Sequence, residues 1–377
     1  RTTWNSGGAL MAKHRGIGMA TIEYPTGMNQ NGDPSQAWIK VKPDGRIDVY
    51  SGTSEIGNGA ITIQTQIIAE TVGVPLNWVT WDNHSTDSSP VCTGTFASRA
   101  TFVAGNAVRN AAADVKARIL EMAAEVMEVG AEDLEIEDGM VSVKGAPDTA
   151  LDLGEIAGAA TYGAGRMLTG SGAHLTTPAA IIDPKTGEVD NPPHSAISYA
   201  GCVAEVEVDD VTGEVTVIAM NQAYDVGKAI NPTQVEGQIE GGALMGIGLT
   251  LLEESYPYYP STEHRGSRFG QYLAPTMDDL PELECTIIES PSVTGPFGAK
   301  AIGEMSNNSQ PPAIAIAIHD AVGVWLTELP ITPERVLKAI EVRDAGEADP
   351  HRDGKYVIFD RDASINSVGD GSLTWAP

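Results

Sequence analysis

The sequence predicts an α+β fold, in which β-hairpins and mixed sheets pack against helices. Three segments alternate between apolar and polar residues on both sides of a turn signal, which is the pattern of a β-hairpin. These segments are Ala37 to Tyr50 around Pro43-Asp44-Gly45, Leu134 to Val143 around Asp138-Gly139, and Cys202 to Ile218 around Thr212-Gly213. Helical spacing of apolar residues occurs in Ala60 to Val72, roughly Gly105 to Val129, Gln234 to Leu252, Ala313 to Leu326 and Thr332 to Ile340. Hairpins and helices follow in mixed order without a strand–helix–strand rhythm, which indicates α+β rather than a parallel sheet.

The third hairpin and the last helix carry clear local signals. In the hairpin, apolar residues alternate with acidic ones from Ala204 to Asp209, so we expect one buried face and one wet face, with Asp209 on the wet one. The last helix has Thr332 as N-cap and Pro333 at its first position. Residues 150–200 and 256–281 are rich in Gly, Pro, Ser, Thr and Tyr, and we expect long surface excursions there that reach over a partner.

Composition limits the kinds of partner. The chain has 377 residues, with 23 basic and 51 acidic side chains, so the net charge is 23 − 51 = −28. This excess argues against nucleic acids and anionic membranes as partners, because both are polyanions. The three cysteines lie far apart, which disfavours an iron–sulfur or structural zinc site held by this chain alone and makes a cytoplasmic location the default expectation. No run of 18 apolar residues and no signal-peptide pattern is present.

One isolated carboxylate stands out near the C-terminus. Glu304 follows Gly303, and the segment from Met305 to His319 contains no Asp, Glu, Lys or Arg. A carboxylate ahead of an apolar helix is expected in low-dielectric surroundings, where desolvation raises its pKa toward the value that a general base needs. The local pattern therefore makes Glu304 a candidate buried general base, although a Glu beside a Gly is more often an ordinary loop residue.

Three further segments have the composition of ligand-binding turns. Ser51 to Ala60 contains three glycines before a helix, Thr93 to Thr101 gathers hydroxyl groups before another, and Gln234 to Gly248 has five glycines at helical spacing. Free N–H groups at a helix N-terminus bind phosphates and other anionic ligands. Plain strand-to-helix turns, capping by Ser and Thr, and tight helix packing are the alternatives. Arg99 binds either an anion or one of the many carboxylates of the chain, and we favour the carboxylate.

Taken in order, these segments resemble the molybdenum hydroxylase (xanthine oxidase) family. Gly52 to Gly59 is similar to its G-T-x-E-x-G-Q-G element, and Thr95 to Thr101 to its second cofactor loop, with the Ser-Arg variant of the carbon monoxide dehydrogenase branch. The residues Asp225-Val226-Gly227, Asn231-Pro232 and Gln238-x-Glu240-Gly241 match the stretch that leads to its glycine-rich helix. Gly298-x-Lys300-x-x-Gly303-Glu304 matches its G-x-K-x-x-G-E signature.

The resemblance covers residues 11–340 and implies the C-terminal half of the molybdopterin-binding unit, built as two interleaved α+β lobes. We expect residues 1–10 to be an N-terminal extension or a trimmed start, and residues 341–377 to be an extension that packs on the domain or on a partner. The chain then resembles the medium molybdopterin subunit of a split enzyme such as nicotinate dehydrogenase. Its expected partners are a second molybdopterin subunit, an iron–sulfur subunit with [2Fe-2S] clusters and a flavin subunit with FAD.

By this resemblance the metal is held by the dithiolene of molybdopterin, commonly the cytosine dinucleotide in bacteria, and by no protein side chain. Glu304 becomes the catalytic base, and Tyr24 and Met28 face the substrate. The expected cofactor-binding residues are Gly57, Asn58, Gly59, Phe96, Ala97, Ser98, Met245 and Lys300. Lys300 is expected to add positive charge near the Glu304 loop.

Three departures from the family pattern limit the transfer. Asn58 and Met245 each replace a Gln, and Met28 stands where xanthine enzymes have a Phe that sandwiches the purine, so xanthine is a poor first candidate. The leading hypothesis is hydroxylation of a small N-heteroaromatic, nicotinate-like, with oxygen from water. The alternatives are an aldehyde- or carbon monoxide-oxidising relative, a non-catalytic scaffold for a molybdopterin partner, and a generic soluble binding protein.

Overall fold

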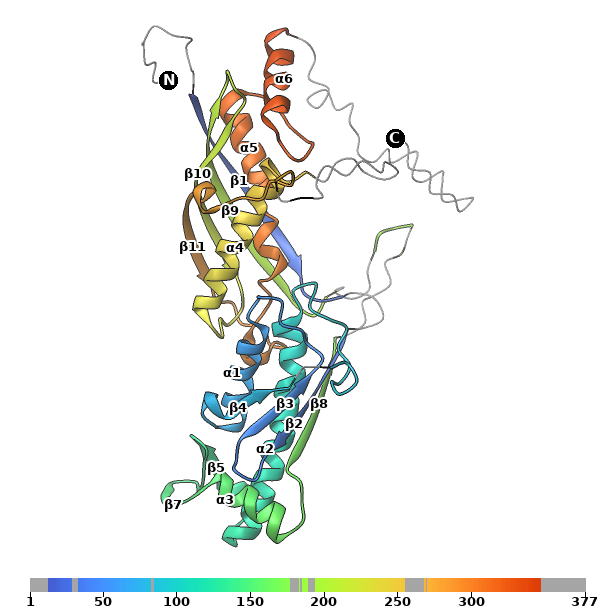
Figure 1. Cartoon of the computed structure of the whole chain (residues 1–377), viewed down its shortest axis with the longest axis vertical. Helices are drawn as coiled ribbons and strands as arrows, with labels where there is room; N and C mark the ends of the chain where they lie inside the picture. Colours follow the sequence, from blue (N-terminus) through green and yellow to red (C-terminus); the bar gives the residue numbers. More distant parts are fainter. Residues whose placement is uncertain are drawn as a thin grey trace.

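The computed structural model is elongated, with one group of strands and helices toward each end (Figure 1). It describes residues 13–28, 33–82, 85–176, 183, 185–188, 194–254, 268 and 270–346. Residues 1–10 and most of 341–377, the expected extensions, lie outside these ranges. Among the described residues, no helix is both long and apolar enough to cross a membrane.

One group is built on a four-stranded sheet in the order β1-β9-β10-β11. Its strands are β1 (Lys13–Pro25), β9 (Ile197–Asp209), β10 (Val215–Asp225) and β11 (Glu282–Ile288). β9 pairs antiparallel with β1 and β10, and β11 runs parallel to β10. Because β1 lies in this sheet although more than 160 residues separate it from β9, the two ends of the described chain meet in one core.

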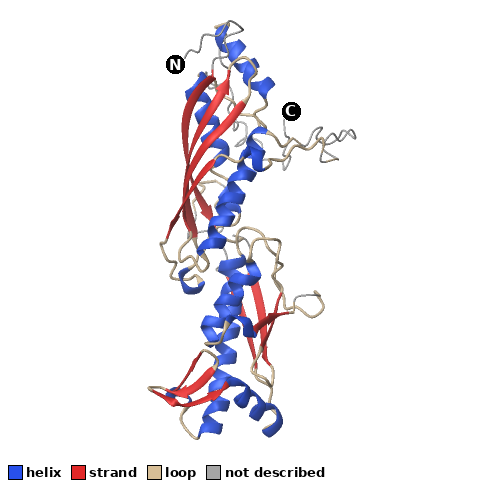
Figure 2. Ribbon diagram, turned by 60° about the vertical axis from the view of Figure 1, so that its left-hand side comes forward, coloured by secondary structure: helices blue, strands red, loops and turns tan. Residues whose placement is uncertain are grey.

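Helices lie along the long strands of this sheet (Figure 2). They are α4 (Pro232–Leu251), α5 (Gln310–Val322) and α6 (Pro333–Asp344). Two glycines of β1 let the backbone of α5 approach closely: a Cβ on Gly16 would lie 2.1 Å from the carbonyl oxygen of Ala317, and one on Gly18 2.1 Å from that of Ala313. A larger residue at either position would therefore push the helix off the sheet.

The other group contains two smaller sheets, in the orders β4-β3-β2-β8 and β5-β6-β7. The first has β2 (Pro34–Val41), β3 (Ile47–Ser51), β4 (Val79–Trp81) and β8 (Thr169–Leu175). The second has β5 (Leu134–Glu137), β6 (Met140–Val143) and β7 (Ala146–Asp152). The helices are α1 (Ala60–Val72), α2 (Gly105–Met127) and α3 (Leu153–Gly158). Their apolar faces and those of the strands form a single buried cluster.

Short helical turns connect these elements. They are η1 (Leu76–Trp78), η2 (Ala100–Ala104), η3 (Ala131–Asp133), η4 (Ala159–Gly163), η6 (Met277–Asp279), η7 (Pro296–Gly298) and η8 (Glu304–Asn307). Two of them matter for function, because η2 follows the hydroxyl-rich loop and η8 begins at Glu304.

The structure confirms the α+β class, the three hairpins and the five helices. The predicted range of α1 is the observed one, whereas α5 begins three residues earlier than predicted and ends at Val322. The helix ends there because Gly323 adopts a left-handed φ of 73° and its backbone N–H donates to the carbonyl oxygen of His319.

Two local predictions were wrong. The segment 150–200 is not one surface excursion, since it contains α3 and β8, and β8 pairs with β2. Gly170 and Gly172 are there for close packing, because a Cβ on either would lie within 2.4 Å of the α2 backbone at Ala111. Asp209 is buried rather than wet, since its carboxylate accepts hydrogen bonds from two backbone N–H groups of the following turn. The other predicted excursion, 256–281, lies largely outside the described residues.

Candidate functional site

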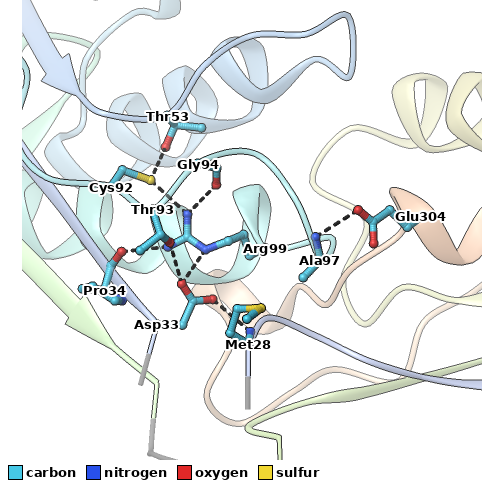
Figure 3. Close-up of polar contacts among 10 residues, drawn as sticks. All are labelled: Met28, Asp33, Pro34, Thr53, Cys92, Thr93, Gly94, Ala97, Arg99 and Glu304. Carbon is cyan, nitrogen blue, oxygen red and sulfur yellow. Dashed lines mark hydrogen bonds and ion pairs between the residues drawn. The ribbon is translucent and has the colours of Figure 1, made fainter. Parts of the chain in front are cut away.

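Glu304 lies where three distant segments meet. The Tyr24 hydroxyl at the end of β1 donates to Oε2 at 2.5 Å, and the backbone N–H of Ala97 donates to Oε1 at 3.0 Å. The backbone N–H of Glu304 donates to Oγ of Ser98 at 2.7 Å. Figure 3 shows the Glu304 carboxylate turned toward Ala97. Both carboxylate oxygens are thus oriented by donors that are far from Glu304 in the sequence.

Glu304 is exposed in this chain, which corrects the prediction of a buried carboxylate. The apolar residues after it do not surround it, because Met305 turns into the core and is fully buried while Glu304 faces out. Tyr24 is half-buried, and burial, followed by its hydrogen bond to Glu304, raises the pKa of Tyr24 to about 12. The hydroxyl therefore stays protonated, and remains a donor, at neutral pH.

The loop that presents Ala97 has an unusual backbone. Ala97 and Ser98 have φ values of 47° and 51°, in the left-handed region that costs a residue with a Cβ about 1–2 kcal/mol. The carbonyl oxygen of Ala97 accepts a hydrogen bond of 2.9 Å from the N–H of Gly27. The strained turn is thus held on one side by the end of β1 and on the other by Glu304.

A cleft of about 320 Å³ opens beside Glu304. Five of the predicted residues line it: Asn58, Phe96, Ser98, Met245 and Glu304. Other lining residues carried no predicted binding role, and they include Thr95, Gln238, Gly241, Gly242, Ile302 and Asn307. Gln238 and Gly241 belong to one of the quoted motifs, so that motif was the available signal for them. A smaller hollow of about 40 Å³ shares Asn58 and Gln238 with the cleft and is also lined by Lys300.

Four of the predicted cofactor-binding residues have other partners in the structure. The N–H groups of Gly57 and Gly59 donate to the carboxylate of Glu55, at 2.8 and 3.0 Å, so the chain fills its own anion-binding turn. The backbone N–H of Ala97 donates its hydrogen bond to Oε1 of Glu304. Lys300 forms an ion pair of 2.6 Å with Asp225, and both side chains are almost fully buried, so its charge is balanced locally rather than offered to the Glu304 loop.

Six predicted residues do not line the cleft: Gly57, Gly59, Ala97, Lys300, Tyr24 and Met28. Tyr24 and Ala97 bond to Glu304 at its edge and Lys300 lines the smaller hollow, whereas Met28 lies in the turn after β1. Its side chain is 45% exposed, and its backbone N–H donates to Oδ2 of Asp33 at 3.3 Å. Asp33 in turn forms a fully buried ion pair with Arg99, in which Nε and Oδ1 are 2.7 Å apart. The expectation that Arg99 pairs with a carboxylate is therefore confirmed. Nothing in the sequence around Asp33 predicted this role.

Cys92 lies beside the same guanidinium group, 2.9 Å from Nη1 of Arg99. Burial alone would raise the pKa of the Cys92 thiol, but the Ser35 hydroxyl and the positive charge of Arg99 outweigh it and lower the pKa below its usual value. Cys202 differs, since burial raises the pKa of its thiol to about 12.

The residues around the cleft are polar and apolar in mixture and offer no metal-ligand set. Within the described ranges, no group of three or more His, Cys, Asp or Glu side chains is placed to hold a metal ion. A family model described as "Molybdopterin cofactor-binding domain" matches residues 2–281. The chain belongs to this family of molybdenum hydroxylase domains.

Relatives of known activity support the assignment. The nicotine 6-hydroxylase large subunit of Paenarthrobacter nicotinovorans is 34% identical over 308 residues, which are 80% of this chain and 36% of that protein. Among solved structures, quinoline 2-oxidoreductase from Pseudomonas putida 86 matches with a TM-score of 0.75 and 29% identity over 87% of this chain and 42% of that one. Carbon monoxide dehydrogenase from Oligotropha carboxidovorans matches with a TM-score of 0.74 and 25% identity over 89% of this chain and 41% of that one. The molybdopterin-binding chain thus spans about two fifths or less of these relatives.

The cleft fits a cofactor that brings its own metal ligands. Molybdopterin needs hydrogen-bond partners and room for its rings rather than protein ligands to the metal. Gly241 lines the cleft, and a Cβ there would point into open space, so the missing side chain leaves room at the wall. Asn58, Ser98 and Gln238 are polar residues that line this space.

Proposed function

We propose that this chain is the molybdopterin-binding subunit of a multi-subunit molybdenum hydroxylase, and that it hydroxylates a small N-heteroaromatic ring with oxygen from water. The observation that carries the proposal is the Glu304 carboxylate, oriented by Tyr24 and Ala97 at the edge of the cleft. The relatives named for nicotine and quinoline favour an N-heteroaromatic substrate, nicotinate-like in size. The cofactor is molybdopterin, as its cytosine dinucleotide.

Glu304 acts as the base. A carboxylate has about four lone-pair positions on its two oxygens, and Tyr24 and the Ala97 N–H occupy one on each. The remaining positions are free to accept a proton on the exposed side of the group. The bound cofactor supplies the oxygen transfer and the two-electron redox chemistry. This chain contributes a base whose two oxygens are already fixed in direction, which lowers the entropic cost of the proton transfer.

Glu304 is not covered by any of the residues that the structure describes. Its exposure supports a second molybdopterin subunit that closes the cleft. An iron–sulfur subunit with [2Fe-2S] clusters and a flavin subunit with FAD carry the electrons away. Closure would exclude water and strengthen the electrostatic interactions of Glu304 with its donors. Tyr24, and more distantly Met28 on the turn after β1, border the path of the substrate.

Carbon monoxide oxidation is the second candidate. Two observations favour it: the structural match to carbon monoxide dehydrogenase, and the Ser98-Arg99 variant of the cofactor loop. The two candidates differ in substrate, so turnover of nicotinate or of carbon monoxide by the same preparation distinguishes them.

The test uses the complex purified with its partners. We expect stoichiometric molybdenum by elemental analysis, a released pterin cytosine dinucleotide, and incorporation of ¹⁸O from labelled water into a hydroxylated N-heteroaromatic. Glu304→Gln should lower kcat by about 10²–10⁴-fold, the usual contribution of a general base. The matched control is Glu135→Gln, which alters an exposed carboxylate on β5 and should leave kcat unchanged. Full turnover by a fully metallated Glu304→Gln complex would refute the role of Glu304 as the base and favour a non-catalytic scaffold. Absence of molybdenum from the purified complex would refute the assignment as a molybdenum hydroxylase.

A further inference from the structure

The most deeply buried charges of the described residues are Asp33 and Arg99, and Arg99 belongs to the cofactor loop. The side chains of Asp33 and Arg99 are both 0% exposed, and their atoms Oδ1 and Nε lie 2.7 Å apart. Burying two charges is expensive, and a pair of this kind persists only where its geometry and its additional hydrogen bonds are good. The contacts of the pair therefore indicate what it holds.

Arg99 holds the cofactor loop from behind. Its Nη1 donates to the carbonyl oxygen of Gly94 at 2.7 Å and to the sulfur of Cys92 at 2.9 Å, and its Nη2 donates to the carbonyl oxygen of Pro34 at 2.9 Å. Figure 3 shows these contacts on one side of the loop and the contact from Ala97 to Glu304 on another. The guanidinium group thus fixes the start of the loop.

Asp33 holds the two segments that meet at Glu304. Its Oδ1 accepts a hydrogen bond of 2.9 Å from the Thr93 hydroxyl, in the cofactor loop. Its Oδ2 accepts one of 3.3 Å from the N–H of Met28, in the turn that follows β1. In that same turn the N–H of Gly27 donates to the carbonyl oxygen of Ala97. One carboxylate therefore connects the turn after Tyr24 to the loop that contains Ala97.

We propose that the Asp33–Arg99 pair is a positioning element, which fixes the turn after β1 against the strained Ala97-Ser98 turn and thereby sets the two donors of Glu304. Tyr24 lies three residues before Gly27, and Ala97 lies two residues before Arg99, so a shift of either segment would move one donor relative to the other. Left-handed φ values at two consecutive non-glycine residues persist only when the surroundings impose them. Arg99 is the buried anchor next to these two residues. The catalytic consequence rests on the proposed function, whereas the structural consequence does not.

The test compares three variants within the complete complex. Asp33→Asn removes one charge of the pair. The double variant Asp33→Leu/Arg99→Met removes the tether without stranding a charge, and replacements of this kind are often tolerated by the fold. Val115→Ala is the control, since it opens a cavity in the same core without touching the loop.

Hydrogen exchange at the Gly27 and Ala97 amides is the first readout, because neither amide is bonded to Asp33 itself. We expect both tether variants to speed this exchange at least tenfold, while Val115→Ala speeds it much less at matched thermal stability. Unchanged exchange, or an equal rise in the control, would overturn the proposal. This readout needs no turnover, so it stands even if no substrate is hydroxylated and the proposed function fails.

Turnover is the second readout. A positioning role predicts that Asp33→Asn lowers kcat at least tenfold, with little change in KM. It also predicts that Asp33→Asn and Tyr24→Phe are not multiplicative, since both displace the same donor. Asp33→Glu should recover part of the loss. Fully multiplicative losses would assign Asp33 a merely structural role and would also refute the proposal.

Discussion

Removal of the Tyr24 hydroxyl is the sharpest perturbation of the proposed base. Tyr24→Phe keeps the ring that packs at the end of β1 and deletes only the group that donates to Oε2 of Glu304 at 2.5 Å. The carboxylate then retains the Ala97 N–H on its other oxygen and gains rotational freedom. Tyr24→Phe therefore tests how much the orientation of the Glu304 carboxylate contributes to kcat while the carboxylate itself is retained.

The expected magnitude follows from the strength of the lost hydrogen bond. A hydrogen bond to a charged group contributes about 1.5–3 kcal/mol. Because Glu304 is exposed in this chain, we take the lower end, about 1.5 kcal/mol, which corresponds to roughly a tenfold fall in kcat. KM should stay within about threefold if Tyr24 acts through Glu304. A rise in KM at constant kcat would instead identify Tyr24 as a substrate contact.

The assay is steady-state turnover of the metallated complex between pH 6 and pH 9. Since the pKa of Tyr24 is raised to about 12, the hydroxyl is a donor throughout this range, and the ratio of wild-type to variant kcat should be constant across it. The contribution of the neutral Tyr24 hydroxyl to the free energy of unfolding is complete below pH 10 and is lost as the pH rises from 10 to about 12. Tyr199→Phe is the control, because that tyrosine is 54% exposed on the neighbouring strand. Equal kcat in wild type and Tyr24→Phe would refute the role of the hydroxyl.

Two further predictions concern helix packing and thiol reactivity. Gly242→Ala should lower the melting temperature by a few degrees and displace the η8 turn, because the new methyl group would lie 2.1 Å from Oγ of Ser306. Gly237→Ala is the control: it has open space around it and should be neutral or stabilising. If thermal unfolding showed Gly237→Ala to be the less stable variant, this helix packing would be contradicted. Iodoacetamide at pH 7.5 should alkylate Cys92 well before Cys202, because the pKa of Cys92 is lowered and burial raises that of Cys202 to about 12. Peptide mass spectrometry over time measures the order, and prior labelling of Cys202 would be inconsistent with it.

The sequence predicted the regular elements well because their signals are local. The alternation from Ala204 to Val208 and the capping residues of α6 lie within single segments, and the structure confirms the hairpin and the helix that they indicate. The family motifs also placed Asn58, Ser98 and Glu304 around one cleft. The glycines of β8 led to the wrong prediction of a surface excursion over residues 150–200. The amino-acid composition alone does not distinguish a glycine that allows close helix packing from a glycine in a loop.

The polar partners could not be predicted from the sequence. Lys300 and Asp225 are 75 positions apart, and Asp33 and Arg99 are 66 apart, so no spacing rule relates either pair. Glu55 satisfies the N–H groups of its own turn, which a motif for ligand binding does not reveal. The exposure of Glu304 follows from how Met305 turns into the core, and the run of uncharged residues after Glu304 does not reveal this turn.

The location of Glu304 makes its geometry depend on how the two groups of elements meet. Tyr24 belongs to the long four-stranded sheet, whereas Ala97 belongs to the loop that leads into α2 in the other group. Glu304 bonds to both, so a small relative shift of the groups would break one of its two hydrogen bonds. Because hydrogen bonds weaken steeply as their distance and angle depart from the optimum, the carboxylate is oriented only when the groups are closed on each other. Under the proposed function, contacts that fix this junction, such as the hydrogen bond from Gly27 to Ala97, position the base without touching the substrate.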